Sequence, residues 1–312
     1  MDFLYIILGL IFLIVGGNLL LKAAVGLSLR LSIPKIVIGM TVVSLATSAP
    51  ELIVSIRSAL DGFPDLALGN VVGSNVANLA LVLGITITLS RIDVEKSFYK
   101  TDWPVMMIAS GMLFYFLLDD KKIDFNEGII MVSMLIVFLV YLLRFQKTAA
   151  VVDEMPEDDV ELPLYKIVLF LVIGGLGLWG GSELLIDGAV NLAKIFGVSE
   201  RVIGVTVVSI GTSIPELAAS IIAVLKKEKA ISLGNLVGSN IFNILAVLGI
   251  TSMITPINLQ DAELLNYDIY WMLGISFLIF PLVFFPRKLR LDWKDGFILL
   301  ILYAVFIFTT LY

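Results

Sequence analysis

Two glutamates, Glu51 and Glu216, lie in equivalent contexts inside apolar stretches of the chain. The first context reads GMTVVSLATSAPELIVS and the second reads GVTVVSIGTSIPELAAS, with about 11 of 17 positions identical at an offset of 165 residues. On a helix, the hydroxyl groups three and four residues before each glutamate share its face. Carboxylates flanked by hydroxyls offer the oxygen ligands that hard cations such as Ca²⁺ and Na⁺ prefer. The hydroxyls belong to Thr47, Ser48, Thr212 and Ser213.

A second block is repeated at the same offset. LGNVVGSNVANLALVLGIT returns as LGNLVGSNIFNILAVLGIT, with about 13 of 19 positions identical, so the chain contains a duplicated unit. Each copy of this block places a serine and an asparagine four residues apart, on one face of a helix. These candidate oxygen ligands are Ser74, Asn78, Ser239 and Asn243. Small residues four apart predict close helix approach at Gly69, Gly73, Gly234 and Gly238.

Prolines interrupt both copies of the first block. Pro50 and Pro215 lack a backbone N–H, so the carbonyl four residues earlier loses its helical partner. Freed carbonyls at membrane depth persist only where they line a cavity or coordinate something. We therefore expect the backbones of residues 44–47 and 209–212 to supply further ligands.

The free-energy cost of a membrane carboxylate argues for a function. A charge at the centre of a span costs roughly 2.5–3.5 kcal/mol even on the lenient insertion scale, so two symmetric glutamates predict a bound cation. The alternatives are structural. Each glutamate could be protonated and hydrogen-bonded within a bundle, the asparagines could join helices, and the hydroxyls could bond their own helix backbone.

Composition identifies the setting of these groups as a membrane. Hydrophobic residues make up 59% of the 312 and charged residues only 15%, and apolar runs of about 18 to 25 residues follow one another. Cysteine and histidine are absent, which excludes disulfides, thiolate catalysis and histidine-based zinc sites. The first run has no basic leader or cleavage signature and is expected to be a retained helix. Ten spans are predicted, at 2–21, 34–59, 66–89, 103–118, 128–143, 164–186, 201–225, 231–255, 267–285 and 295–311.

Charge in the loops predicts an orientation. With the amino terminus on side one, 5 of the 21 Lys and Arg residues fall on that side and 16 on the other, which places both termini outside the cell membrane. Five spans per half make the second copy enter from the opposite side, an inverted repeat. The predicted organisation is a first five-helix repeat at 1–144, an acidic cytoplasmic linker at 145–163 and a second repeat at 164–312. The fold class is an all-α membrane protein with discontinuous core helices.

The paired TSxPE and GNxxGSNxxN motifs resemble the α-repeats of the calcium/cation antiporter superfamily. They stand as TSAPE at 47–51, TSIPE at 212–216, GNVVGSNVAN at 69–78 and GNLVGSNIFN at 234–243. Among the branches, the chain looks most like the compact prokaryotic sodium/calcium exchangers, and the resemblance covers essentially its whole length. It implies alternating-access antiport of three Na⁺ against one Ca²⁺.

The resemblance also implies roles for single residues. Glu51 and Glu216 would be shared ligands of Ca²⁺ and Na⁺, converging in mid-bilayer, with Asn78 and Asn243 at the central plane. Ser44 and Ser209 occupy positions where the family uses main-chain carbonyls. Some relatives, including potassium-dependent exchangers, carry aspartate at position 243, so asparagine here argues against K⁺ co-transport. The flanking ligands would be Thr47, Ser48, Ser74, Thr212, Ser213 and Ser239.

Other functions stay open at this point. A cation/proton antiporter of the same fold is the nearest, a cation channel is next, and an intramembrane enzyme is disfavoured because no histidine or cysteine is present. We expect no cofactor, no nucleic-acid partner, a lipid bilayer around the chain, Ca²⁺ and Na⁺ as substrates, and a monomer.

Overall fold

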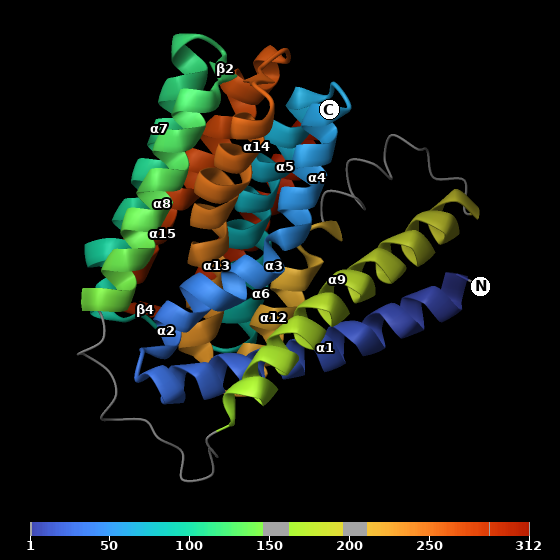
Figure 1. The fold of residues 1–312 in the computed structure, drawn as a ribbon, viewed down its shortest axis with the longest axis vertical. Coiled ribbons are helices and arrows are strands. Elements are labelled where there is room, and N and C mark those ends of the chain that lie inside the picture. The colour runs from blue at the N-terminus through green and yellow to red at the C-terminus, as the bar shows by residue number, and fades with distance from the viewer. Residues whose placement is uncertain (1, 146–161, 196–210, 287, 312) are drawn as a thin grey trace. The chain divides into compact units, whose positions relative to one another are not determined.

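The computed structural model describes residues 2–145, 162–195, 211–286 and 288–311 (Figure 1). The chain divides into two compact units that each draw on both sequence copies. Unit 1 takes residues 1–47 and 142–235, and unit 2 takes 48–141 and 236–312. The predicted linker at 145–163 lies almost wholly outside the described residues, and its place between the repeats stays a prediction.

Unit 1 is built on two long apolar helices. The first helix ends at Leu31 because Ser32 turns with φ 52° and Pro34 cannot continue a helix. The described elements of unit 1 are α1 (Asp2–Leu31), α2 (Lys35–Ile38), the π-helix η1 (Gly39–Val43), α3 (Ser44–Thr47), α9 (Leu164–Ile195), α12 (Ile214–Leu225) and the start of α13 (Lys229–Phe242).

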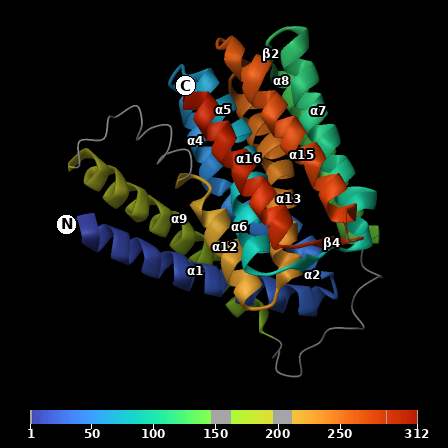
Figure 2. The same ribbon diagram turned by 180° about the vertical axis from the view of Figure 1, so that it is seen from behind.

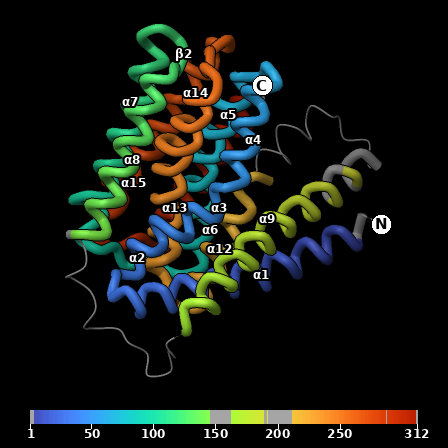
Figure 3. Tube along the Cα trace, viewed as in Figure 1, coloured from blue at the N-terminus to red at the C-terminus, as the bar shows by residue number. Residues whose placement is uncertain are grey.

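Glycines bring α1 and α9 into backbone contact, and the two helices run side by side (Figures 1, 2 and 3). A Cβ atom added to Gly9 would lie 2.8 Å from the carbonyl oxygen of Gly181. One added to Gly16 would lie 2.9 Å from the carbonyl oxygen of Gly174. Gly9 and Gly174 are equivalent at the 165-residue offset, as are Gly16 and Gly181. The two contacts therefore exchange when the copies are exchanged, which is the signature of a two-fold axis.

Unit 2 holds the remaining helices. Over their most apolar 18 residues, the span Pro64–Leu89 is 78% buried and the span Lys229–Ile254, most of which belongs to this unit, is 83% buried, whereas Phe125–Arg144 is only 28% buried. The elements are α4 (Ala49–Leu60), α5 (Pro64–Val76), η2 (Ala77–Val82), α6 (Leu83–Leu89), η3 (Phe98–Asp102), α7 (Trp103–Asp119), α8 (Phe125–Phe145), the end of α13, η5 (Asn243–Leu248), α14 (Gly249–Ile254), η6 (Leu264–Asp268), α15 (Ile269–Phe284) and α16 (Trp293–Leu311).

Two short antiparallel strand pairs tie the copies together in unit 2. Ile92 pairs with Leu291, and Ile257 pairs with Ile123. The offsets from 92 to 257 and from 123 to 291 are 165 and 168 residues, so the pairs also exchange under the repeat. Figure 1 shows β2 at one end of this unit and β4 at the other. The strands are β1 (Ile92–Asp93), β2 (Lys122–Ile123), β3 (Ile257–Asn258) and β4 (Arg290–Leu291).

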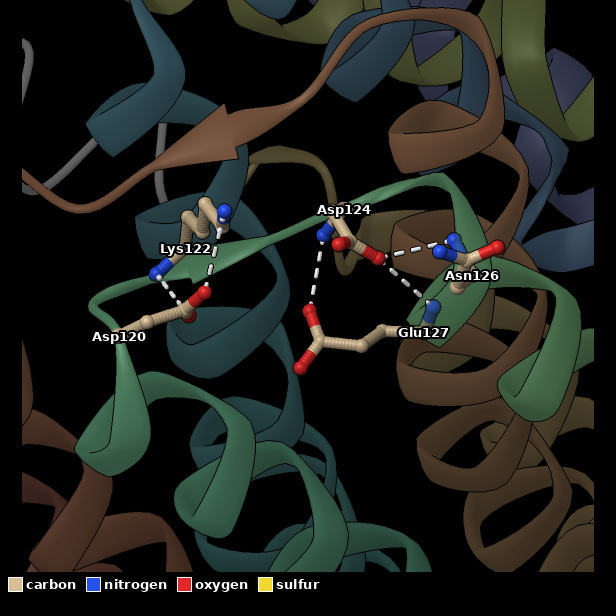
Figure 4. A network of polar contacts seen from close by, with 5 residues as sticks. All are labelled: Asp120, Lys122, Asp124, Asn126 and Glu127. Carbon is tan, nitrogen blue, oxygen red and sulfur yellow. Dashed lines mark hydrogen bonds and ion pairs between the residues drawn. The ribbon is translucent and has the colours of Figure 1, made fainter.

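Side-chain caps start the helix that follows each of the strands β2 and β4, and the first of them is reciprocal. The backbone N–H of Asp124 donates to Glu127 Oε2 at 2.8 Å, while Asp124 Oδ1 accepts from the N–H of Glu127 at 3.0 Å (Figure 4). In the second copy, the N–H of Asp292 donates to Asp295 Oδ2 at 2.8 Å. Beside the first cap, a hydrogen bond from Lys122 to Asp120 raises the pKa of the lysine. These caps satisfy N–H groups that a helix start leaves without partners.

The architecture confirms the predicted fold class. Eight described helices are long and apolar enough to cross a membrane, and the broken stretch Lys35–Leu60 is a ninth candidate. The remaining predicted span, 201–225, is described only from Gly211 onward and contains α12. The first and sixth helices are longer than predicted, and the strand pairs were not foreseen, because a two-residue strand has no periodic pattern.

The predicted glycine contacts are only partly confirmed. In unit 1, a Cβ added to Gly234 would collide with the carbonyl oxygen of Ile36, as expected of close packing. In unit 2 the prediction is wrong for Gly69 and Gly73. A Cβ on Gly69 would lie 3.9 Å from its nearest neighbour, and no described atom comes within 4 Å of one on Gly73. Spacing alone identifies small residues but not the partner that approaches them.

Candidate functional site

In unit 2, a helix break brings a glutamate into a first turn. The helix stops at Thr47, Ser48 adopts φ −87° and ψ 3°, and α4 starts at Ala49 with Pro50 in its first turn. The predicted interruption is therefore present, and its cause is the N–H that proline lacks. Glu51 follows in the same turn, and its side chain is fully buried. The amino-terminal end of a helix carries partial positive charge, which favours a carboxylate there.

An asparagine that sequence reasoning overlooked supports this turn. Asn70 on α5 donates through Nδ2 to the Glu51 carbonyl oxygen at 3.4 Å and to Ser55 Oγ at 3.1 Å. Ser55 Oγ in turn donates to the carbonyl oxygen of Ala67 at 3.5 Å. The signal was available, because Asn70 and Ser55 both recur at the 165-residue offset as Asn235 and Ser220.

The two candidate amides lie at the start of π-helical segments. Asn78 lies in η2 and Asn243 opens η5, so the backbone widens from α to π geometry at both positions. Such π-bulges frequently occur at functional sites. Both side chains are fully buried, and neither Oδ1 atom has a hydrogen-bond partner among the described residues. Each copy therefore holds a buried amide oxygen with its acceptor capacity unused.

The remaining candidates in unit 2 are serine hydroxyls. All of them are buried, and each takes part in an interaction within the protein. Helix α4, which carries the glutamate, contacts α5 and η5, and α5 contacts both η2 and η5, which carry the two amides. The serines are Ser48, Ser74 and Ser239.

Unit 1 repeats the break with the same backbone geometry. Ser213 adopts φ −89° and ψ 3°, α12 starts at Ile214 with Pro215 next, and Glu216 is fully buried in the first turn. The Ser213 hydroxyl is buried and has no hydrogen-bond partner among the described residues. Thr212, just before it, is half-buried and engaged in an interaction.

Asn235 in unit 1 is equivalent to Asn70 in unit 2, and its side chain likewise donates to a serine hydroxyl of the neighbouring helix. Its Nδ2 donates to Ser220 Oγ at 3.4 Å, and its Oδ1 accepts from Thr47 Oγ1 at 3.2 Å. Ser44 Oγ donates to the Asn235 carbonyl oxygen at 2.9 Å, so the side chain of Ser44 joins two helices. The hydroxyl of Thr47 is thereby held next to the break.

Backbone ligands were expected from residues 44–47 and 209–212. The carbonyl oxygen of Gly211, which Pro215 leaves without its helical donor, accepts a hydrogen bond from Ser182 Oγ at 2.9 Å. A carbonyl oxygen has a second lone pair, so this bond is compatible with a ligand role. Ser209 lies outside the described residues.

The donor set suits reversible binding of a hard cation. Each unit supplies one buried carboxylate together with neutral hydroxyl and amide oxygens, and the described residues contain no group of three or more acidic side chains placed to hold a metal ion. Oxygen donors of this kind suit Ca²⁺ and Na⁺, and affinity falls as fewer ligands are charged. A set with few charges therefore fits an ion that must leave again.

Known proteins share this chain's sequence pattern and fold. The model of the sodium/calcium exchanger protein family matches residues 1–144 and 166–312. The chain is 37% identical over 303 residues to a candidate antiporter, CaxA, of Alkalimonas amylolytica, covering 95% of this chain and 94% of that protein. It is 26% identical over 358 residues to the sodium/calcium exchanger MaX1 of Methanosarcina acetivorans, covering 100% and 99%.

A solved structure agrees with these matches. The sodium-calcium exchanger NCX_Mj, soaked with Na⁺ and Ca²⁺, superposes with a TM-score of 0.82 at 26% identity, covering 99% of this chain and 98% of that one. The same exchanger soaked without either ion gives 0.83. These findings support a multi-pass membrane protein that carries out cation/Ca²⁺ antiport. The chain belongs to the sodium/calcium exchanger protein family.

Proposed function

We propose that this chain exchanges Na⁺ for Ca²⁺ across the cell membrane by alternating access, with three Na⁺ moving against one Ca²⁺ and without K⁺. In this proposal Glu51 and Glu216 bind the same Ca²⁺ ion and, in its absence, Na⁺. The hydroxyl and amide oxygens of the candidate site complete the ligand set.

The observation that carries the proposal is the matched pair of buried glutamates. Each is fully buried and lies in the first turn after a break with nearly identical dihedral angles, at Ser48 and Ser213. An ionised carboxylate in such a place is expensive unless a cation neutralises it. The unused amide oxygens of Asn78 and Asn243 support the same conclusion, because they are acceptors and a cation requires acceptors.

Charge balance explains how one site couples two ions. Two carboxylates carry a charge of −2, which one Ca²⁺ or two Na⁺ neutralise, and surrounding dipoles can tolerate a third Na⁺. Na⁺ and Ca²⁺ have similar radii, so a single oxygen cage holds either but not both. An empty, charged site resists crossing the membrane, whereas an occupied site is neutralised. Exchange follows because only the occupied forms cross.

The same residues bear on which ions take part. Asn243 is neutral, so the site has two acidic ligands and lacks the additional carboxylate found in some potassium-dependent relatives. The distribution of Lys and Arg favours outside termini and a cytoplasmic linker. Proton coupling is the competing function, and the experiment below separates it from Na⁺ coupling.

Reconstitution into proteoliposomes tests the proposal. Vesicles loaded with Na⁺ should take up ⁴⁵Ca²⁺ from a Na⁺-free medium, and K⁺ on either side should leave the rate unchanged. Three Na⁺ leaving for one Ca²⁺ entering carries one positive charge outward, so an inside-positive potential should accelerate uptake.

Two results would overturn this proposal. Uptake driven by a pH jump in the complete absence of Na⁺ would establish proton coupling instead. An ion conductance that does not saturate would establish a channel. In both measurements, protein-free vesicles in the same buffer serve as the blank and separate protein-mediated flux from leak.

A further inference from the structure

A crossed set of hydrogen bonds joins the two sequence copies inside unit 2. Asn78 Nδ2 donates to Asn240 Oδ1 at 3.3 Å, and Asn243 Nδ2 donates to Asn75 Oδ1 at 3.1 Å. Asn75 and Asn240 are equivalent at the 165-residue offset, as are Asn78 and Asn243. The two bonds therefore exchange under the repeat. All four side chains are buried.

The orientation of Asn75 and Asn240 is dictated by groups that can only accept. Asn75 Nδ2 donates to the backbone carbonyl oxygen of Asn240 at 3.2 Å and approaches the sulfur of Met272 at 3.8 Å. Asn240 Nδ2 approaches the sulfur of Met106 at 3.9 Å. Carbonyl oxygens and thioethers have no proton to give, so each NH₂ group must face them. The oxygen atom of each amide is thereby turned the other way.

The orientation of Asn75 and Asn240 determines which end of the Asn78 and Asn243 amides faces them. Because Asn75 and Asn240 present oxygen atoms, Asn78 and Asn243 must meet them with their NH₂ groups. The oxygen atoms of Asn78 and Asn243 are what remains, and these are the buried atoms without a partner among the described residues. With either amide reversed, an NH₂ group carrying partial positive charge would take the place of that oxygen and repel a cation.

We propose that Asn75 and Asn240 are positioning residues that hold the amides of Asn78 and Asn243 with oxygen toward the transported cation. The inference rests on the proposed function, which makes Asn78 and Asn243 ligands and names Ca²⁺ and Na⁺ as the ions. An amide can present either a donor or an acceptor, and this network selects the acceptor in both copies. The network sets the cation affinity of the site without contributing a ligand of its own.

Asn75→Ala and Asn240→Ala test the proposal in the full-length purified protein. Equilibrium binding of ⁴⁵Ca²⁺ in Na⁺-free detergent solution should weaken about 10-fold or more in each, the range typical of lost support behind a metal ligand. In proteoliposomes the apparent KM for Ca²⁺ should rise by a similar factor, while the maximal rate at saturating Ca²⁺ changes much less. The matched control is Asn126→Ala, which removes an exposed amide from the start of α8.

A second substitution distinguishes positioning from general support of the fold. A carboxylate accepts through both oxygens, so aspartate at position 243 needs no orienting partner. Asn75→Ala combined with Asn243→Asp should therefore recover most of the lost Ca²⁺ affinity. Asn243→Asp alone should gain less, because its carboxylate would face the Asn75 oxygen. Asn240→Ala and Asn78→Asp form an equivalent double-mutant cycle. In each cycle the effect of the added charge cancels, because the alanine substitution is compared with and without the aspartate.

Each outcome decides the matter. Weakened binding with recovery in both double variants supports positioning. Binding in Asn75→Ala and Asn240→Ala equal to that of Asn126→Ala overturns it, as does weakened binding without any recovery. Because ⁴⁵Ca²⁺ binding is measured without a Na⁺ gradient, a failure of Na⁺ coupling in vesicles would leave this test intact.

Discussion

The two sequence copies meet in different ways in the two compact units. In unit 1, α1 and α9 touch through glycine backbones, at Gly9 with Gly181 and at Gly16 with Gly174. In unit 2, the copies are joined by directional bonds, namely the strand pairs β1–β4 and β2–β3 and the crossed asparagine network. Both arrangements are two-fold symmetric. Unit 1 also has hydrogen bonds between the copies, from Ser44 and Thr47 to Asn235, and unit 2 also has glycine contacts, such as Gly84 with Gly296. The difference between the units is therefore the crossed network of amides, which is described only in unit 2.

This difference indicates what each unit can specify. Glycine contacts require close approach but carry little directional preference. Hydrogen bonds between amides fix distance, register and polarity together. Unit 2 is therefore the better place to orient neutral oxygen ligands, whereas the carboxylates, whose two oxygens are equivalent acceptors, can lie in either unit.

The largest expected effect comes from the glutamates, one in each unit. Glu51→Gln and Glu216→Gln should each abolish Na⁺-dependent ⁴⁵Ca²⁺ uptake, since losing one partner of a buried charge pair costs about 3–5 kcal/mol, at least roughly 100-fold in affinity. The protein should still insert and fold, as judged by a single size-exclusion peak. Glu263→Gln, the same change at an exposed position, is the control. Wild-type flux in either buried variant would show that the two units are not equivalent.

The glycine contact in unit 1 should be the next most sensitive feature. In Gly16→Ala the new methyl group would lie 2.8 Å from the backbone nitrogen of Leu178, so α1 and α9 must separate. Overpacking of this kind costs about 1–3 kcal/mol and should lower the melting temperature in detergent. Gly111→Ala on α7 is the matched control, because no described atom lies within 4 Å of its new methyl group. Identical melting curves would refute the importance of the glycine contact.

The supporting asparagines allow a direct comparison between units. Asn235→Ala removes the acceptor for Thr47 and the donor to Ser220 at a fully buried position, whereas Asn70 is half-buried. We expect Ca²⁺ affinity to fall about 10-fold in Asn235→Ala and about 3-fold in Asn70→Ala. Side-by-side ⁴⁵Ca²⁺ binding measures both. The reverse order would mean that Glu51 in unit 2 depends more on Asn70 than Glu216 in unit 1 depends on Asn235.

The smallest effect concerns the strand pairs of unit 2. Asp93 lies opposite Arg290 with oxygen and nitrogen 3.8 Å apart, while the equivalent pair is Asn258 opposite Lys122. Asn258→Asp should add a second carboxylate opposite Lys122, which already pairs with Asp120, and Asp93→Asn should remove the partner of Arg290. Exposed pairs contribute little, so each should shift the melting temperature by no more than about 2 °C, and less at high salt. A larger shift in melting temperature would show that ion pairs contribute substantially to the stability of the strand pairs.

Much of the site was accessible from residue patterns. The duplication placed Glu51 and Glu216 in register, and Pro50 and Pro215 predicted the helix breaks, which the structure confirms at Ser48 and Ser213. Asn70 was missed although it recurs in the second copy, because its only visible feature was repetition. The ligand roles themselves remain predictions.

Residue patterns were enough to predict the membrane setting, the two copies and the positions of the helix breaks, because these depend on local composition and on the missing proline N–H. The packed structure was needed to show which glycines meet a neighbour, where the helices widen to π geometry, and which end of each amide is left unpaired. An asparagine has a donor and an acceptor at the same distance from its backbone, and the acceptor-only groups that choose between them are a thioether and a carbonyl far away in the sequence.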